Sequence, residues 1–224
     1  MHIPDGYLGP ITYGGLWGVM APVWYWASRK VRETLKASEV PLLALGAAVS
    51  FVIMMINIPV VGGTTGHATG AVLLAIVLGP SAACIAVSIA LVVQAVLFGD
   101  GGITAIGANS FNIAFIGLFS GYLVFKLLAA KDSLRKRLLI ASGLAGYIGI
   151  NVSALFTAVE LGLQVILHTG PDGRPLYSPF PLEITIPAIM IEHLAIFGFV
   201  EGAFTAFSLA YITKAHPELV RARK

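Results

Sequence analysis

Charged residues are scarce in this chain of 224 residues. Asp, Glu, Lys and Arg make up only 11% of it, whereas 57% of the residues are hydrophobic and the mean hydropathy is +0.88. A soluble globular domain carries about 25% charged residues, because its surface faces water. The composition therefore excludes a soluble enzyme and predicts an all-α integral membrane protein that crosses the bilayer several times.

Cysteine and phosphate-binding loops are also missing. The single cysteine, Cys84, excludes an internal disulfide framework and a thiolate metal cluster. No stretch fits the G-x-x-x-x-G-K-[ST] pattern, and no lysine is followed by serine or threonine. We therefore expect no ATP hydrolysis through that motif, and the net charge of +3 indicates membrane orientation, not nucleic-acid binding.

The hydrophobic runs predict one transmembrane domain, residues 1–224, with about seven spans. The expected spans are Pro10–Ala27, Val40–Ile58, Ala68–Leu78, Ser81–Phe98, Ala108–Leu128, Leu138–Leu167 and Ile184–Thr213. The third makes only about 16 Å of helix, too little to cross a bilayer alone. The extended segment Gly62–His67 is expected to complete that crossing, and the alternative is six spans with a re-entrant piece.

The basic residues predict the orientation. Thirteen of the 14 Lys and Arg residues lie after the first span, after the fifth span or at the chain end, which leaves only Arg174 on the other side. The positive-inside rule makes the basic side cytoplasmic, so the N-terminus is expected outside and the C-terminus inside. The outer face then carries Asp5, Asp100, Asp172 and Glu183, which raise the local concentration of cations.

The first residues, MHIPDGYLG, contain a possible metal chelate. They lack a basic n-region and a cleavage site, so we expect the mature chain to begin at Met1 with a free α-amine outside the membrane. The amine, the amide nitrogen of His2 and its imidazole Nδ1 then close two adjacent chelate rings in one plane. A fourth nitrogen makes a square that favours Ni(II) or Cu(II). The alternative is that His2 is only an exposed polar residue.

The segment VVGGTTGHATG offers that fourth nitrogen in His67. Irregular backbone at membrane depth is tolerated only where it is buried in protein or lines a cavity. A buried His67 needs a hydrogen bond that fixes its tautomer, and the candidates are Asn57, Thr64, Thr65 or a backbone carbonyl. An ordinary surface loop is the alternative.

Three motifs, MHIPDGYLGP, GGTTGHATG and DGGITAIGANSFN, resemble the CbiM/NikM family. These are the substrate-binding membrane subunits (S components) of energy-coupling factor (ECF) importers for cobalt and nickel in prokaryotic plasma membranes. The resemblance covers essentially the whole chain and implies that Met1, His2 and His67 hold the metal. Asn109 and Asn112, three residues apart on one helix face, are expected to support the N-terminal segment or its loop. A helix-start cap is the alternative.

The resemblance also implies partners, namely separate ATPase subunits, a membrane coupling subunit and a possible small accessory membrane subunit. The transported ion is Ni(II) or Co(II), with nickel favoured because of the square-planar nitrogen set. No resident cofactor and no enzymatic activity are expected. The rival interpretations are a stand-alone secondary transporter or channel, an intramembrane hydrolase that uses Ser120 and His193, and a structural scaffold.

Acidic residues inside apolar helices usually mark function. Glu160, Glu192 and Glu201 are of this kind. Glu192 with His193 suggests either a second metal site or a buried polar pair, and we favour the pair. Glu160 is expected to meet a polar group on the seventh span.

Overall fold

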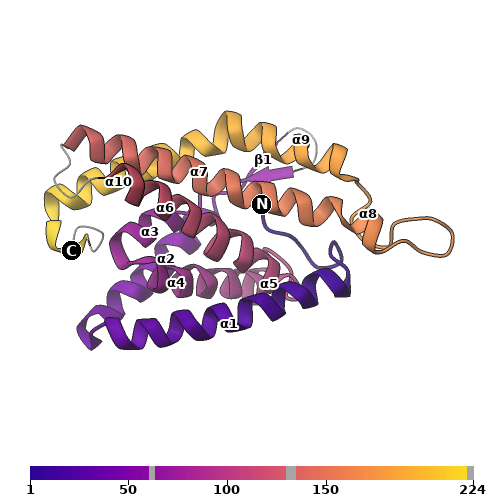
Figure 1. The fold of residues 1–224 in the computed structure, drawn as a ribbon, viewed down its shortest axis with the longest axis horizontal. Helices are drawn as coiled ribbons and strands as arrows, with labels where there is room; N and C mark the ends of the chain where they lie inside the picture. The colour runs from indigo at the N-terminus through magenta and orange to yellow at the C-terminus, as the bar shows by residue number, and fades with distance from the viewer. Residues whose placement is uncertain (61–63, 130–134, 221–224) are drawn as a thin grey trace.

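The computed structural model describes residues 1–60, 64–129 and 135–220, and most of this part is helical (Figure 1). The α-helices are α1 (Pro10–Thr34), α2 (Val40–Met54), α3 (Ala71–Leu78), α4 (Pro80–Val93), α5 (Ile106–Asn109), α6 (Leu118–Leu128), α7 (Arg135–Gly162), α8 (Gln164–Leu167), α9 (Leu182–Glu192) and α10 (Gly198–Ala215). The π-helical segments are η2 (Gln94–Phe98), η3 (Ser110–Gly117) and η4 (His193–Phe197), and the 3₁₀ turns are η1 (Ala37–Glu39) and η5 (Pro217–Leu219).

Five continuous helical runs in the described chain are long and apolar enough to cross a membrane. They are Ala37–Met54, Pro80–Phe98, Ile106–Leu128, Lys136–Leu167 and Leu182–Ala215. These correspond to five of the seven expected spans. The first expected span lies in α1, which has 25 residues but is rich in Trp, Tyr and Gly, and it is not among the five. The helical multi-pass architecture is therefore supported, with fewer clear spans than the seven expected.

Two of the expected spans have a π-helical segment between two α-helices. The run from α5 through η3 to α6 and the run from α9 through η4 to α10 both contain a π-helical segment in the middle. Such segments insert extra residues into a helix and are frequent at functional sites. They begin beside Asn109 and Glu192, two polar residues buried in the bundle.

Helix α3 is short and is enclosed by other helices. All eight of its residues are buried, and it packs against α4, α6 and α7. An antiparallel hairpin precedes it, with β1 (Ile58–Val60) paired to β2 (Thr64–Gly66). Part of the expected segment Gly62–His67 lies outside the described residues, and its other part forms β2 and the turn into α3. Gly66 and His67 are buried, whereas Ile58 in β1 is exposed, so only the end of this stretch that carries His67 meets the requirement that irregular backbone at membrane depth be buried in protein.

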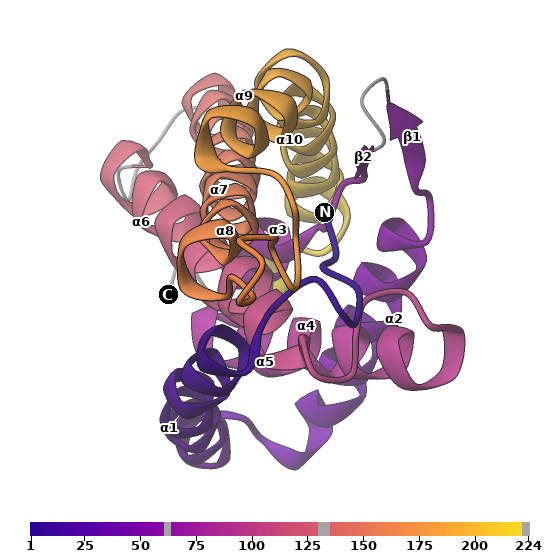
Figure 2. The same cartoon turned by 90° about the vertical axis from the view of Figure 1, so that its right-hand side faces the viewer.

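The N-terminal segment runs into the middle of the molecule, between the β-hairpin and α9 (Figure 2). Met1 and Ile3 are both buried, and Ile3 packs with Leu8, Ala105 and Ala108 in a small apolar cluster. Burial of apolar side chains stabilises this irregular segment much as it does a helix. The first residues of the chain are therefore part of the core.

Candidate metal site

The N-terminal segment is held in place by Asn109. The amide of Asn109 accepts a hydrogen bond from the Ile3 N–H at 2.8 Å and donates one to the Ile3 carbonyl at 3.1 Å. The Gly102 N–H donates to the same carbonyl at 2.9 Å. The backbone of Ile3, the residue after His2, is thereby fixed by groups that lie about 100 residues further along the chain.

A second anchor is the carboxylate of Asp5. It accepts hydrogen bonds from the backbone N–H groups of Ile103 and Thr104, both at 2.9 Å, and from the Thr104 hydroxyl. The Thr104 hydroxyl, together with these backbone donors, lowers the pKa of Asp5. Gly102 lies so close that a Cβ atom there would collide with the Asp5 backbone nitrogen, so glycine is required at this position.

The α-amine of Met1 is buried and hydrogen-bonded. It donates to the Thr65 carbonyl in β2 at 2.7 Å, which ties the chain start to the hairpin. Burial lowers the pKa of the amine to about 6, against the opposing influence of Glu192 and Asp100. Loss of its proton leaves a lone pair that can bind a metal.

His67 lies directly beside His2. The two ring centroids are 4.6 Å apart, and His67 is 1% exposed. Nδ1 of His67 is 3.0 Å from the Ala68 carbonyl, which only accepts hydrogen bonds, so Nδ1 carries the proton and Nε2 carries the lone pair. Burial, followed by the proximity of His2 and the N-terminal amine, holds the pKa of His67 well below its usual range. The ring is therefore neutral with a fixed tautomer, which is the form that a metal would require.

His2 faces Asp100 on its other side. Its side chain is 2% exposed, and its Nδ1 lies 3.0 Å from Asp100 Oδ1. The expected chelate uses this same nitrogen, so a metal at Nδ1 would exchange places with the Asp100 contact. Rotation of the ring about its Cβ–Cγ bond turns Nδ1 away from Asp100. The carboxylate would then remain close as a compensating negative charge.

Glu201 in α10 holds the loop that carries His67. Its fully buried carboxylate accepts hydrogen bonds from the N–H groups of Thr69 at 2.6 Å and Gly70 at 3.0 Å, and from the Thr69 hydroxyl at 3.3 Å. The Ser50 hydroxyl binds the Thr69 carbonyl at 2.8 Å. A typical intramolecular hydrogen bond contributes about 0.5–1.5 kcal/mol. The turn after His67 is thus fixed by one intramembrane acid.

The expected supporting residues have different positions. Thr65 contacts Met1 through its carbonyl, and a backbone carbonyl, that of Ala68, sets the His67 tautomer. Asn57 is exposed beside β1, and the side chain of Thr64 lies outside the described part of the chain. Asn112 does not reach the N-terminal segment: its amide nitrogen donates to Thr157 and Glu160 in α7. One helical turn separates it from Asn109, and the π-helical geometry that begins at Ser110 changes the direction of the side chains.

The remaining intramembrane acids are paired with neighbours. Glu160 accepts its hydrogen bond from Asn112 at 2.8 Å, so its partner lies on the fifth expected span and not on the seventh. Glu192 Oε1 lies 3.4 Å from His193 Nδ1, and that nitrogen also lies 2.8 Å from the Ile189 carbonyl. Both side chains are buried. This is the geometry of a buried polar pair.

The sequence did not indicate which groups Asp5, Asp100 and Glu201 contact. The contact of Glu201 with the His67 loop could have been inferred from the sequence. An acid in an apolar helix needs hydrogen-bond partners, and an irregular loop at membrane depth needs partners for its backbone N–H groups. Within the described residues, no three His, Cys, Asp or Glu side chains converge as a metal cage. The nitrogens that lie close together here are the Met1 amine and those of the two imidazoles.

The fold and the site define a class of protein: a multi-pass helical membrane protein whose buried N-terminus meets two histidines and which carries no nucleotide-binding loop. Comparison with known proteins identifies the family. Residues 2–219 match the family described as "Cobalt uptake substrate-specific transmembrane region". The chain belongs to this CbiM family, whose members are transport proteins of the prokaryotic membrane and not enzymes.

Individual relatives agree with this assignment. The chain is 46% identical over its whole length to a fused nickel transport protein, NikMN, of Rhodobacter capsulatus, and spans 65% of that protein. It is 41% identical to a protein of Methanocaldococcus jannaschii named for metal transport, and spans 96% of it. A crystal structure of a transition metal transporter matches with a TM-score of 0.92 and 46% identity, covering 100% of this chain and 97% of the other.

Proposed function

We propose that this chain is the metal-capturing subunit of a nickel or cobalt importer. The observation that carries the proposal is the meeting of the buried Met1 amine, the His2 ring and the His67 ring within one enclosed space. The relatives named for nickel and cobalt transport support it. The ion enters from the acidic outer face and is enclosed beneath the N-terminal segment.

The proposed ligands form a square of four nitrogens. Met1 contributes its amine, His2 its amide nitrogen and Nδ1, and His67 its Nε2. Square-planar nitrogen coordination favours Ni(II) or Cu(II), and nickel is our choice over cobalt. Asp100 lies next to His2, so a negative charge stands beside the bound dication.

Energy for transport comes from partners in this proposal. We assign the chain to an ECF-type assembly with a membrane coupling subunit and ATPase subunits. The fused NikMN relative is longer than this chain, which leaves room there for a further segment. The alternative, a stand-alone secondary transporter or channel, makes a different prediction about the isolated chain.

The isolated chain is expected to bind Ni(II) without moving it across a bilayer. In proteoliposomes that contain only this chain, ⁶³Ni should remain on the side where it is added, and uptake should require the coupling and ATPase subunits with ATP. Empty liposomes provide the baseline. Nickel equilibration by the chain alone would overturn the ECF assignment and support the stand-alone transporter.

Glu201→Gln is expected to weaken nickel binding. Glutamine keeps one acceptor oxygen but presents an NH₂ group to the Thr69 and Gly70 N–H donors, so the His67 turn loses its fixed position. Loss of a group that orients a ligand typically lowers metal affinity about 10–100-fold. Competition against a chromogenic chelator measures the change. Glu183→Gln, at an exposed position in the first turn of α9, is the matched control and should bind like the wild type.

Asn109→Ala is expected to weaken nickel binding about as much as Glu201→Gln does. It removes both hydrogen bonds that hold Ile3, while Asp5 and its partners stay in place. Nickel affinity should fall about tenfold or more as the N-terminal chelate becomes mobile. The same titration on Asn57→Ala, at the exposed position, serves as the comparison. Equal affinities for the two variants would show that Asn109 does not position the chelate.

A further inference from the structure

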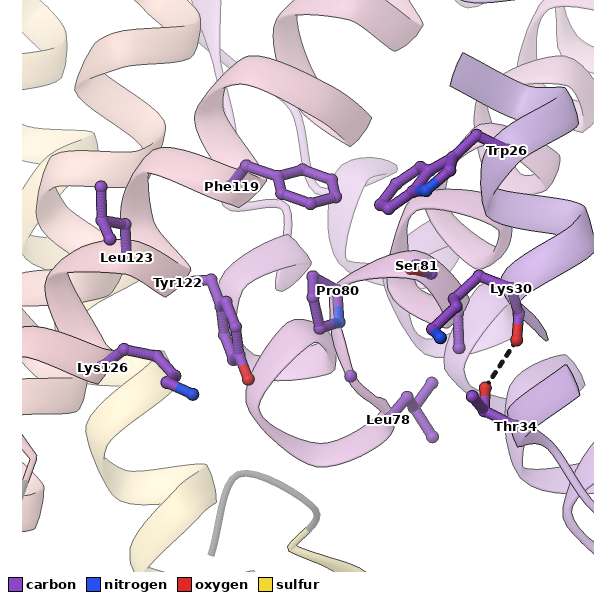
Figure 3. A pocket seen from close by; sticks show the side chains of 12 residues that line it. Trp26, Lys30, Thr34, Leu78, Pro80, Ser81, Phe119, Tyr122, Leu123 and Lys126 are labelled. Atoms are coloured by element: carbon purple, nitrogen blue, oxygen red, sulfur yellow. Dashed lines mark hydrogen bonds between the residues drawn. The ribbon is translucent and has the colours of Figure 1, made fainter. Parts of the chain in front are cut away.

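A groove lies at the other end of α1 from the N-terminal segment. It has a volume of about 720 Å³ and opens between α1, the α3–α4 junction and α6. Figure 3 shows Trp26 and Phe119 facing each other across it, with Tyr122 and Pro80 along its floor. Most of the lining is apolar, and the two aromatic rings are 6.0 Å apart between centroids.

Two lysines frame the groove from opposite sides. Lys30 comes from α1 and Lys126 from α6, and Figure 3 shows Lys126 beside Tyr122. The Lys30 ammonium lies 3.8 Å from Glu33, but both side chains are more than half exposed. Such a surface pair contributes little and exchanges easily for another anion. Together with the Ser81 and Tyr122 side chains at the lining, the lysines offer hydrogen-bond donors to an anion.

The groove is distant from the proposed metal site. Lys30 is 20 residues along α1 from Pro10, which corresponds to about 30 Å of helix. Lys126 lies in the last turn of α6. Both lysines belong to the basic connections that the positive-inside rule places on the cytoplasmic side. With this expected orientation, the groove lies at the depth of the inner-leaflet headgroups.

We propose that this groove binds one anionic phospholipid of the inner leaflet. The phosphate lies between Lys30 and Lys126 and accepts hydrogen bonds from the hydroxyls of Tyr122 and Ser81. An acyl chain lies along Trp26 and Phe119. Charge complementarity selects this occupant: basic pockets between transmembrane helices on the cytoplasmic side are suited to anionic headgroups. The proposal is independent of metal binding at the other end of the molecule.

Native mass spectrometry of the purified full chain tests the proposal. The chain is incubated with equal amounts of phosphatidylglycerol and phosphatidylcholine of the same acyl composition, and the retained lipid is counted. The expected preference for phosphatidylglycerol is up to about thirtyfold, because two lysines act on its net negative charge, which the choline group cancels in phosphatidylcholine. Lys30→Gln with Lys126→Gln should abolish the preference. Lys36→Gln with Lys214→Gln removes the same charge away from the groove and should retain it.

A third variant separates charge from shape. Ser81→Phe fills the groove and keeps both lysines, so it should also reduce retention of phosphatidylglycerol. Near-ultraviolet circular dichroism confirms that each variant is folded. Equal retention of the two lipids by the wild type overturns the proposal, as expected if a helix of a protein partner is the true occupant. Equal losses in the two double-lysine variants overturn it too, because general surface charge would then explain the binding.

Discussion

A chain extended by four residues before Met1 is expected to lose tight nickel binding. The extension converts the Met1 amine into an amide, which removes one proposed ligand and the start of the chelate. It also has to pass through a space that is closed around Met1, whose amine lies 2.7 Å from the Thr65 carbonyl. The loss of affinity should exceed the roughly 100-fold that follows when only a supporting residue is removed. Equilibrium dialysis against nickel with elemental analysis measures it.

The design of the extension matters. Inserting a single residue after Met1 is a poor test, because histidine then stands third and a second amide nitrogen can close a four-nitrogen square without His67. Four residues added at the C-terminus form the matched control and should leave nickel binding unchanged. Tight binding by the N-terminally extended chain would refute a role for the free amine.

His67→Ala is expected to cause the second largest loss of nickel affinity. The ring provides the fourth nitrogen, with its tautomer fixed by the Ala68 carbonyl, and no described side chain replaces it in the square. We expect affinity to fall by more than about 100-fold, with water in the fourth position. His216→Ala, in the exposed turn after α10, is the control. Binding that survives in His67→Ala but disappears in His193→Ala would move the site to the pair of Glu192 and His193.

The chemistry of the chain start was predictable because it is local. The amine, the amide and the imidazole of His2 are fixed in sequence, and their chelate rings follow from bond lengths alone. His67 was identifiable because a glycine- and threonine-rich segment in an apolar chain has to be buried in protein. The geometry brings these residues together, and their use as metal ligands stays a prediction.

The groups that hold the site were not predictable from spacing. Asn109 reaches Ile3 across 106 residues, and Glu201 reaches Thr69 across 132. Such contacts depend on which helices become neighbours, and hydrophobic periodicity does not encode that choice. Asn112 shows the limit clearly. Its spacing from Asn109 suggested a shared role, but the π-helical segment between them turns its amide toward α7.

The number of spans was predicted from runs of apolar residues. Such runs show how apolar a segment is, but not whether it faces lipid or other helices. Helix α1 is rich in Trp and Tyr, residues that suit the membrane interface. It is therefore long enough to cross a bilayer, but it is less apolar than the five clear spans. Helix α3 is apolar because it is surrounded by protein, and its eight residues do not span a bilayer. Composition alone does not distinguish contact with lipid from contact with other helices.

X-ray absorption spectroscopy of the nickel-loaded chain with its native N-terminus tests the central claim most directly. The account predicts one Ni(II) per chain with four nitrogen neighbours and the edge features of square-planar geometry. The outer shells should show scattering from two imidazole rings, because His2 and His67 both bind. A six-coordinate spectrum dominated by oxygen neighbours, or scattering from one imidazole alone, would contradict the Met1–His2–His67 site.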